Sequence, residues 1–158
     1  MGSVYCAPLL VGLAFLTRNL SSRLKCSPPE SVMQKRILLV DDNPVMRRLI
    51  RTFLEFRPDV EVCGEASDGL EGVEKGVELK PDVIVLDFCM PGVDGLQAAI
   101  MFHEVIPDTP IILFTVFQDE TLDRLAHDAG VASVLCKTDE LTTLTDEIQR
   151  LTGQQPKN

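Results

Sequence analysis

The sequence predicts an α/β fold in which a parallel β-sheet lies between two layers of helices. From Arg36 onward, short apolar runs alternate with stretches of helical period, which is the pattern of βα units that form a parallel sheet. Val83 to Leu86 are apolar at every position, as expected for a strand covered on both faces. Right-handed crossovers between such units give a three-layer sandwich with all carboxyl strand ends at one edge.

Five strands and five helices account for this alternation. We predict strands at residues 36–40, 60–66, 83–87, 111–115 and 133–136, and helices at about residues 44–56, 70–80, 95–105, 119–129 and 139–151. Asn43 is suited to cap the first helix, with Pro44 at its first position, and Gly130 to follow the fourth helix in a left-handed conformation. The predicted buried stripe of the fourth helix consists of Leu122, Leu125, Ala126 and Ala129.

The composition fits one domain and disfavours a nucleic-acid or membrane-surface partner. The chain has 158 residues, 45% apolar and 25% charged, which is enough for a single core. Its formal net charge is −9, and residues 33–158 alone carry about −11, so the domain should repel phosphates. The five cysteines are odd in number and lack C-x-x-C spacing, which argues against a disulfide framework or a zinc site and predicts a reducing, cytoplasmic location.

We predict three parts along the chain: an N-terminal extension over residues 1–32, a domain over residues 33–152 and a flexible tail over residues 153–158. The apolar run from Ala7 to Leu16 is too short to span a bilayer, and no positive residue precedes it as in a signal peptide. The domain-like pattern begins at Met33, so the extension is expected to be either disordered or an over-called start.

Polar side chains follow four of the predicted strands at their carboxyl ends. Asp41 and Asp42 follow the first strand, Asp87 ends the third, Thr115 ends the fourth and Lys137 follows the fifth. Because these strand ends meet at one edge of the sheet, where open α/β sheets bind their ligands, we expect the side chains to converge. The edge is therefore the candidate functional site.

Three convergent carboxylates indicate a hard divalent cation, since each would otherwise raise the pKa of the others. Mg²⁺ prefers oxygen ligands and commonly binds through one or two carboxylates and a phosphate. We expect Asp42 and Asp87 to bind Mg²⁺ directly and Asp41 to bind through water, with the backbone carbonyl of Cys89 as a further ligand.

Asp87 is also a candidate nucleophile. When a metal ion polarises an incoming phosphoryl group, a carboxylate oxygen can attack phosphorus and form an acyl phosphate. Lys137 would then bind the phosphoryl oxygens as a point charge, and the Thr115 hydroxyl would donate a hydrogen bond to one of them.

Residues 37–43 and 86–95, together with Thr115 and Lys137, resemble the receiver domain of bacterial two-component response regulators over about residues 35–151. The resemblance implies a flavodoxin-like (βα)5 sandwich with strand order 2-1-3-4-5. It also implies a phosphorelay protein in which Asp87 accepts a phosphoryl group, with Mg²⁺, from a histidine kinase or phosphotransfer protein. Such a protein assists its own phosphorylation and dephosphorylation and is not a turnover enzyme.

The resemblance extends to the expected output. Residues 62–69 and 135–138 are similar to receivers joined to a helix-turn-helix DNA-binding domain, but the sequence ends at Asn158. We therefore expect a single-domain regulator without direct DNA binding. It would signal to an unknown protein target through the face of the fourth helix, fifth strand and fifth helix, as a monomer or a weak homodimer formed through that face.

One departure from the receiver pattern leaves an alternative open. Receivers often carry Tyr or Phe three residues before the lysine, where this chain has Val134. The alternative is an interaction module that keeps the fold and works without phosphorylation.

Arg47, Arg48 and Arg51 on the first helix are candidates to meet an acidic kinase surface.

Two other classes fit the first loop less well. A haloacid-dehalogenase-like phosphatase places an Asp-x-Asp pattern after its first strand, which Asp41-Asp42-Asn43 does not supply. A flavin or nucleotide binder of related topology would carry a Ser/Thr/Gly-rich loop there, whereas the two aspartates would repel phosphate without a metal.

Overall fold

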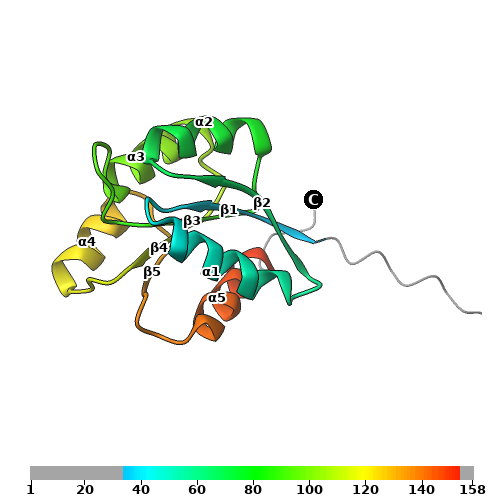
Figure 1. The fold of residues 1–158 in the computed structure, drawn as a ribbon. Coiled ribbons are helices and arrows are strands. Elements are labelled where there is room, and N and C mark those ends of the chain that lie inside the picture. The colour runs from blue at the N-terminus through cyan, green and yellow to red at the C-terminus, as the bar shows by residue number, and fades with distance from the viewer. Residues whose placement is uncertain (1–33, 154–158) are drawn as a thin grey trace, which may run out of the picture. The chain divides into compact units, whose positions relative to one another are not determined.

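The computed structural model describes residues 34–153, which form five strands and five helices in strict alternation (Figure 1). The strands are β1 (Lys35–Val40), β2 (Val60–Ala66), β3 (Val83–Leu86), β4 (Ile111–Thr115) and β5 (Ser133–Cys136). The helices are α1 (Pro44–Glu55), α2 (Gly69–Leu79), α3 (Gly95–Val105), α4 (Glu120–Asp128) and α5 (Leu141–Gly153). The predicted α/β class and all ten elements are confirmed.

The sheet has the order β2-β1-β3-β4-β5, and all four strand pairs are parallel. The predicted order 2-1-3-4-5 is therefore confirmed. The β1–β2 register shifts between Ile37 and Leu38, while the other three pairs run without a shift. Parallel pairing places the carboxyl ends of all five strands at one edge.

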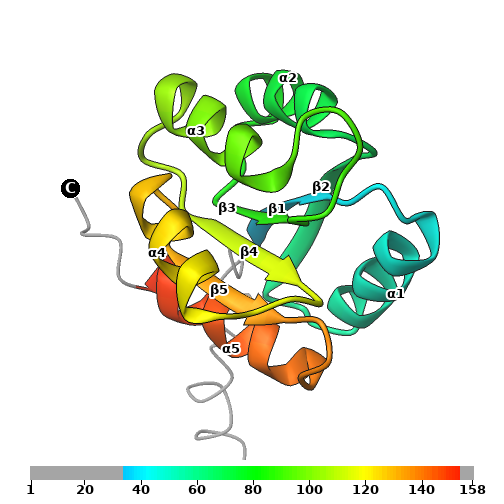
Figure 2. The same ribbon diagram turned by 90° about the vertical axis from the view of Figure 1, so that its left-hand side faces the viewer.

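Two hydrophobic cores lie on opposite faces of the sheet, because successive strand residues point to opposite sides. On one face, α2, α3 and α4 cover residues such as Leu38, Leu86 and Leu113. On the other face, α1 and α5 cover residues such as Leu39 and Phe114. Figures 1 and 2 show the resulting three layers, with α2 and α3 across the sheet from α1 and α5.

Side-chain caps set where several helices begin. The Asn43 side chain accepts hydrogen bonds from the backbone N–H groups of Val45 and Met46, at 2.9 and 3.3 Å, as predicted for the cap of α1. Asp68, Asp94 and Asp119 cap α2, α3 and α4 in the same way.

The end of α4 matches one expectation and corrects another. Gly130 follows the helix with a φ of +81°, as predicted. Leu122, Ala126 and Ala129 are buried, but Leu125 is 50% exposed, so its predicted burial is wrong. Leu125 instead borders a surface hollow beside Phe88 and Phe117.

The last helix also differs from its predicted range. It begins at Leu141 because the backbone N–H of Asp139 donates to the carbonyl of Cys136, which forms a turn between β5 and α5. It continues through Gly153, the first residue of the predicted tail. The predicted extension over residues 1–32 and the rest of the tail lie outside the described residues. In the part of the chain that the structure describes, no helix is long and apolar enough to cross a membrane.

Gly95 allows the loop after β3 to return closely over the strand end. A Cβ atom there would lie 2.7 Å from the Cα of Phe88 and would overlap the carbonyl oxygen of Asp87. The Gly95 N–H donates to the Phe88 carbonyl at 3.0 Å, so the backbones are in contact. This close approach fixes the position of Asp87 relative to α3.

We expect Gly95→Ala to lower the free energy of unfolding by about 1–3 kcal/mol, because backbone atoms must move to admit the methyl group. Urea unfolding measures the change. Gly153→Ala is the matched control, since no atom lies within 4 Å of a Cβ at that position, and it should cost no stability. Equal stability of the two variants would contradict the prediction.

Candidate functional site

The structure brings the predicted residues together at the carboxyl edge of the sheet. Asp41 follows β1, Asp87 follows β3, Thr115 is the last residue of β4 and Lys137 follows β5. Asp42, next to Asp41, completes the acidic group. Because β1, β3, β4 and β5 are neighbours in the sheet, four strand ends contribute to one small region.

Lys137 binds two of the three carboxylates. Its Nζ lies 2.6 Å from Oδ2 of Asp41 and 2.9 Å from Oδ1 of Asp87. The three side chains are only 4–7% exposed, so the ion pairs are shielded from water. A buried ammonium between two carboxylates offsets the cost of removing all three charges from solvent.

Asp41 is fixed by further hydrogen bonds. Its Oδ1 accepts from the backbone N–H of Asn43 at 2.8 Å, and its own N–H donates to the carbonyl of Ala66 at 3.1 Å. Its carbonyl oxygen accepts from the guanidinium of Arg47. Both carboxylate oxygens and both backbone groups of Asp41 therefore have partners.

Burial raises the pKa of Asp87, since desolvation disfavours its charged form. The hydrogen bond and charge of Lys137 oppose this shift, and the negative charge of Asp41 adds to it. The net pKa of Asp87 lies above its ordinary value. A second cation beside Asp87 would stabilise its charged form and so lower this pKa.

The donor set fits Mg²⁺. One oxygen each from Asp41, Asp42 and Asp87 lies within 4.8 Å of the others, and Asp42 is exposed while the other two are buried. The three carboxylates and the Lys137 ammonium together carry a formal charge of −2, which one divalent cation would neutralise. Hard oxygen ligands with open access to water are typical of Mg²⁺ sites. The role of the Cys89 carbonyl stays a prediction.

Thr115 is fully buried, and its hydroxyl oxygen accepts a hydrogen bond from the N–H of Phe117 at 3.2 Å. Its carbonyl accepts from the N–H of Lys137 at 2.7 Å, so the two residues are joined through the backbone. The segment after Thr115 leads to Asp119, which caps α4. Thr115 thus connects the site to α4 along the chain.

The surface beside the site is apolar. Phe88, Phe117, Leu122 and Leu125 line a hollow of about 210 Å³ together with Asp119 and Thr121. Val134 on β5 is partly buried against the core on the α4 side of the sheet. The position at which receivers often carry an aromatic ring is therefore packed by a smaller side chain.

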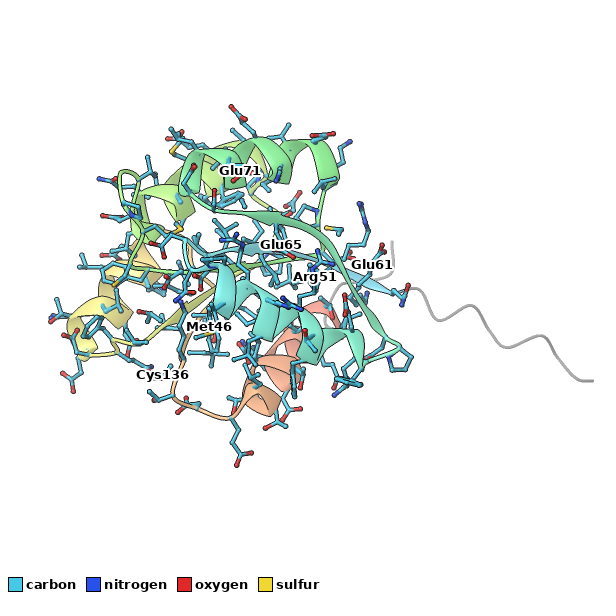
Figure 3. All side chains as sticks on the ribbon, in the orientation of Figure 1. Met46, Arg51, Glu61, Glu65, Glu71 and Cys136 are labelled. Atoms are coloured by element: carbon cyan, nitrogen blue, oxygen red, sulfur yellow. The ribbon has the colours of Figure 1, made fainter. Side chains whose placement is uncertain are left out.

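Sequence reasoning missed the partners of two arginines on α1. Arg47 and Arg51 both form ion pairs with Glu65 at the end of β2. Contact of these arginines with an acidic kinase surface stays a prediction. Figure 3 shows Arg51 and Glu65 next to each other. The four-residue spacing of the arginines placed them on one helix face, but the sequence did not show which strand residue faces them.

The strand order, the three carboxylates and the buried lysine define the class of CheY-like receiver domains. The response regulator receiver domain family matches residues 37–149, and the chain belongs to this family.

The chain is similar to part of the length of curated proteins that are longer than the matched region. It is 42% identical over 122 residues to the transcriptional regulatory protein LiaR of Bacillus subtilis, covering 77% of this chain and 58% of LiaR. It is 33% identical over 118 residues to the response regulator protein VraR of Staphylococcus aureus, covering 75% and 56%. The chain thus spans little more than half the length of these relatives.

Solved structures show the same fold. The response regulator domain of Thermotoga maritima CheB has a TM-score of 0.72 and 30% identity, covering 78% of this chain and 99% of that one. The receiver domain of the putative response regulator NarL from Mycobacterium tuberculosis has a TM-score of 0.73 and 28% identity, covering 77% and 98%. The likeness is to receivers of the LuxR/NarL type.

We expect Asp87→Asn to raise the free energy of unfolding of the metal-free protein by about 0.5–2 kcal/mol at pH 7. The folded carboxyl has a raised pKa, so it keeps its proton to a higher pH than the unfolded one, and stability falls as the pH rises through that interval. The gain from Asn should therefore shrink as the pH falls through that interval, and it should be lost below about 3.9, the ordinary aspartate pKa.

Urea unfolding in EDTA across this pH range tests the expectation. The exposed Asp108 provides the control, and Asp108→Asn should change stability by less than about 0.5 kcal/mol at every pH. An Asp87→Asn protein less stable than wild type at pH 7 would contradict the argument.

Proposed function

We propose that this receiver domain accepts a phosphoryl group on Asp87 from a histidine kinase or a phosphotransfer protein. The observation that carries the proposal is the buried Asp87 carboxylate, held by Lys137 beside Asp41 and Asp42. Family membership supports the same function. The protein is then a phosphoacceptor that assists its own reaction and not a turnover enzyme.

In the proposed reaction, an oxygen of the Asp87 carboxylate attacks phosphorus and the phosphorus–nitrogen bond of a phosphohistidine breaks. The electron pair of that bond leaves with the imidazole, and an acyl phosphate forms on Asp87. Lys137, which pairs with Asp41 and Asp87 before the reaction, would then bind the phosphoryl oxygens, where its charge offsets the new negative charge. Bound Mg²⁺ would supply charge neutralisation and Lewis-acid polarisation of the phosphoryl group, held by Asp42, Asp87, the Cys89 carbonyl and, through water, Asp41.

The acyl phosphate is then lost to water. The Thr115 hydroxyl oxygen accepts from the Phe117 N–H, and its own O–H is free to donate to a phosphoryl oxygen. When the hydroxyl turns to donate to the phosphoryl group, the segment before Asp119 must adjust and α4 with it. This is a population shift driven by a local charge.

The proposed output surface is the α4–β5–α5 face, recognised by a downstream protein that the sequence does not name. The strongly acidic charge argues against direct DNA binding and against a membrane surface. We propose a monomer, or a weak homodimer through the same face, that works in the cytoplasm.

A second function is favoured by Val134. Without an aromatic ring at this position, phosphorylation could act on α4 through Thr115 alone, and an interaction module that works without phosphorylation is the alternative. The presence of every predicted site residue favours the phosphorylation-dependent function over this alternative. These residues are Asp41, Asp42, Asp87, Thr115 and Lys137.

Incubation of the full chain with Mg²⁺ and acetyl phosphate should add one phosphoryl group, detected by intact-mass spectrometry. Asp87→Asn is the matched variant and should gain none, because its amide is not a nucleophile. Replacing Mg²⁺ with EDTA should also abolish the adduct. A folded wild-type protein without an adduct, or one equally modified in Asp87→Asn, would support the phosphorylation-independent module.

Thr115→Val should still accept the phosphoryl group but should lose most of the response of α4, since the isosteric side chain has no hydroxyl. Amide chemical shifts of residues 120–128 and 133–136, recorded with and without acetyl phosphate, measure that response. Thr143→Val, at an exposed position of α5, should respond as wild type does. An unchanged response in Thr115→Val would exclude the hydroxyl as the link.

A further inference from the structure

Arg47 on α1 holds two groups on neighbouring strands. Its Nη1 donates to the backbone carbonyl of Asp41, which follows β1, and its Nε lies 3.3 Å from Oε2 of Glu65 on β2. The Arg47 side chain is 16% exposed and that of Glu65 is 28% exposed. The guanidinium therefore bridges the acidic loop and the edge strand in a partly buried setting.

The carbonyl that Arg47 binds belongs to the peptide group joining Asp41 to Asp42. A peptide group is planar, so fixing its oxygen also fixes the direction in which the chain enters Asp42. Asp42 is exposed, and among the described residues no hydrogen bond to its carboxylate is present. Its orientation thus depends on the peptide group that Arg47 holds.

Glu65 keeps Arg47 in place and balances its charge. The Glu65 carboxylate pairs with Arg47 and with Arg51, and its carbonyl accepts from Lys75 at 2.5 Å. Burial raises the pKa of Glu65, but its hydrogen bonds and ion pairs with Arg51 and Arg47 outweigh this and lower it overall. Glu65 is therefore a charged anchor, fixed at both its backbone and its side chain.

We propose that Arg47 is a positioning residue for the divalent cation, which orients the Asp42 carboxylate through the Asp41 carbonyl and is itself held by Glu65. The inference rests on the proposed Mg²⁺ site and extends it to two residues that do not touch the metal. Partners that hold metal-binding carboxylates typically contribute tenfold or more to metal affinity.

Loss of Arg47 should change the Mg²⁺ affinity in one direction if only its charge matters, and in the other direction if it positions the Asp41 carbonyl. Removing a positive charge near an acidic site should strengthen Mg²⁺ binding by Coulomb attraction. Losing the hydrogen bond to the Asp41 carbonyl frees the peptide group, so binding must order it again and should weaken. The sign of the change therefore distinguishes a positioning role from a purely electrostatic one.

The test is the Mg²⁺ dissociation constant of the full chain, measured by calorimetry and by amide chemical shifts in the absence of any phosphoryl donor. Arg47→Ala should raise the dissociation constant by about tenfold. Arg51→Ala is the matched control. It removes a positive charge from the same helix and breaks an ion pair with the same partner, Glu65, but Arg51 makes no hydrogen bond to Asp41. Its dissociation constant should be unchanged or slightly lower.

Two further readouts strengthen the test. In the metal-free protein, Arg47→Ala should speed hydrogen exchange of the Asn43 amide, which donates to Asp41, while Arg51→Ala should not. Arg47→Lys keeps the charge but replaces the planar guanidinium, whose Nη1 and Nε reach Asp41 and Glu65, with a single ammonium group. Its Mg²⁺ binding should therefore stay weaker than that of wild type. Full affinity in Arg47→Lys would overturn the bridging geometry.

Equal Mg²⁺ affinity of wild type and Arg47→Ala, or tighter binding by the variant, would overturn this inference and leave the proposed phosphoacceptor intact. A folded wild-type protein that binds no Mg²⁺ would overturn both this inference and the metal site of the proposed function. Weaker binding by Arg47→Ala with normal binding by Arg51→Ala would support the positioning role.

Discussion

The ammonium of Lys137 between Asp41 and Asp87 is the interaction on which the site depends. Two carboxylates this close and this buried repel each other, and little water is present to weaken the repulsion. The ammonium offsets that repulsion where the sheet places them. It also ties the end of β5 to the ends of β1 and β3, so the geometry of the sheet and the charge of the site are set by the same contact.

This arrangement follows from parallel topology more than from any one motif. Asp41 and Lys137 are 96 residues apart in the sequence, yet both directly follow strands of one parallel sheet. The buried strands hold their backbones rigidly, and the close approach at Gly95 fixes the loop after Asp87. The shared direction of the strands, rather than proximity in sequence, brings the acidic and basic groups together.

The sequence was sufficient to predict the order of elements and most of the site, because apolar periodicity and strand-end polarity are properties of local segments. It was not sufficient for Arg47 and Glu65, whose pairing depends on the register of β1 against β2 and on side-chain conformations. The predicted burial of Leu125 was also wrong. Helical spacing shows which residues share a face of α4, but which residues of that face are covered depends on neighbours such as Phe88 and Phe117. In both cases tertiary packing decided the outcome.

The two hydrophobic cores on opposite faces of the sheet determine which packing contacts a movement of α4 would change. Helix α4 packs within one core and α5 within the other, and β5, which lies at the sheet edge, is half-buried at all four of its residues. A displacement of α4 can therefore be absorbed by repacking on one side of the sheet while the opposite layer keeps its contacts. The fold thus assigns α4 and α5 to separate cores, and β5 at the sheet edge lies between them.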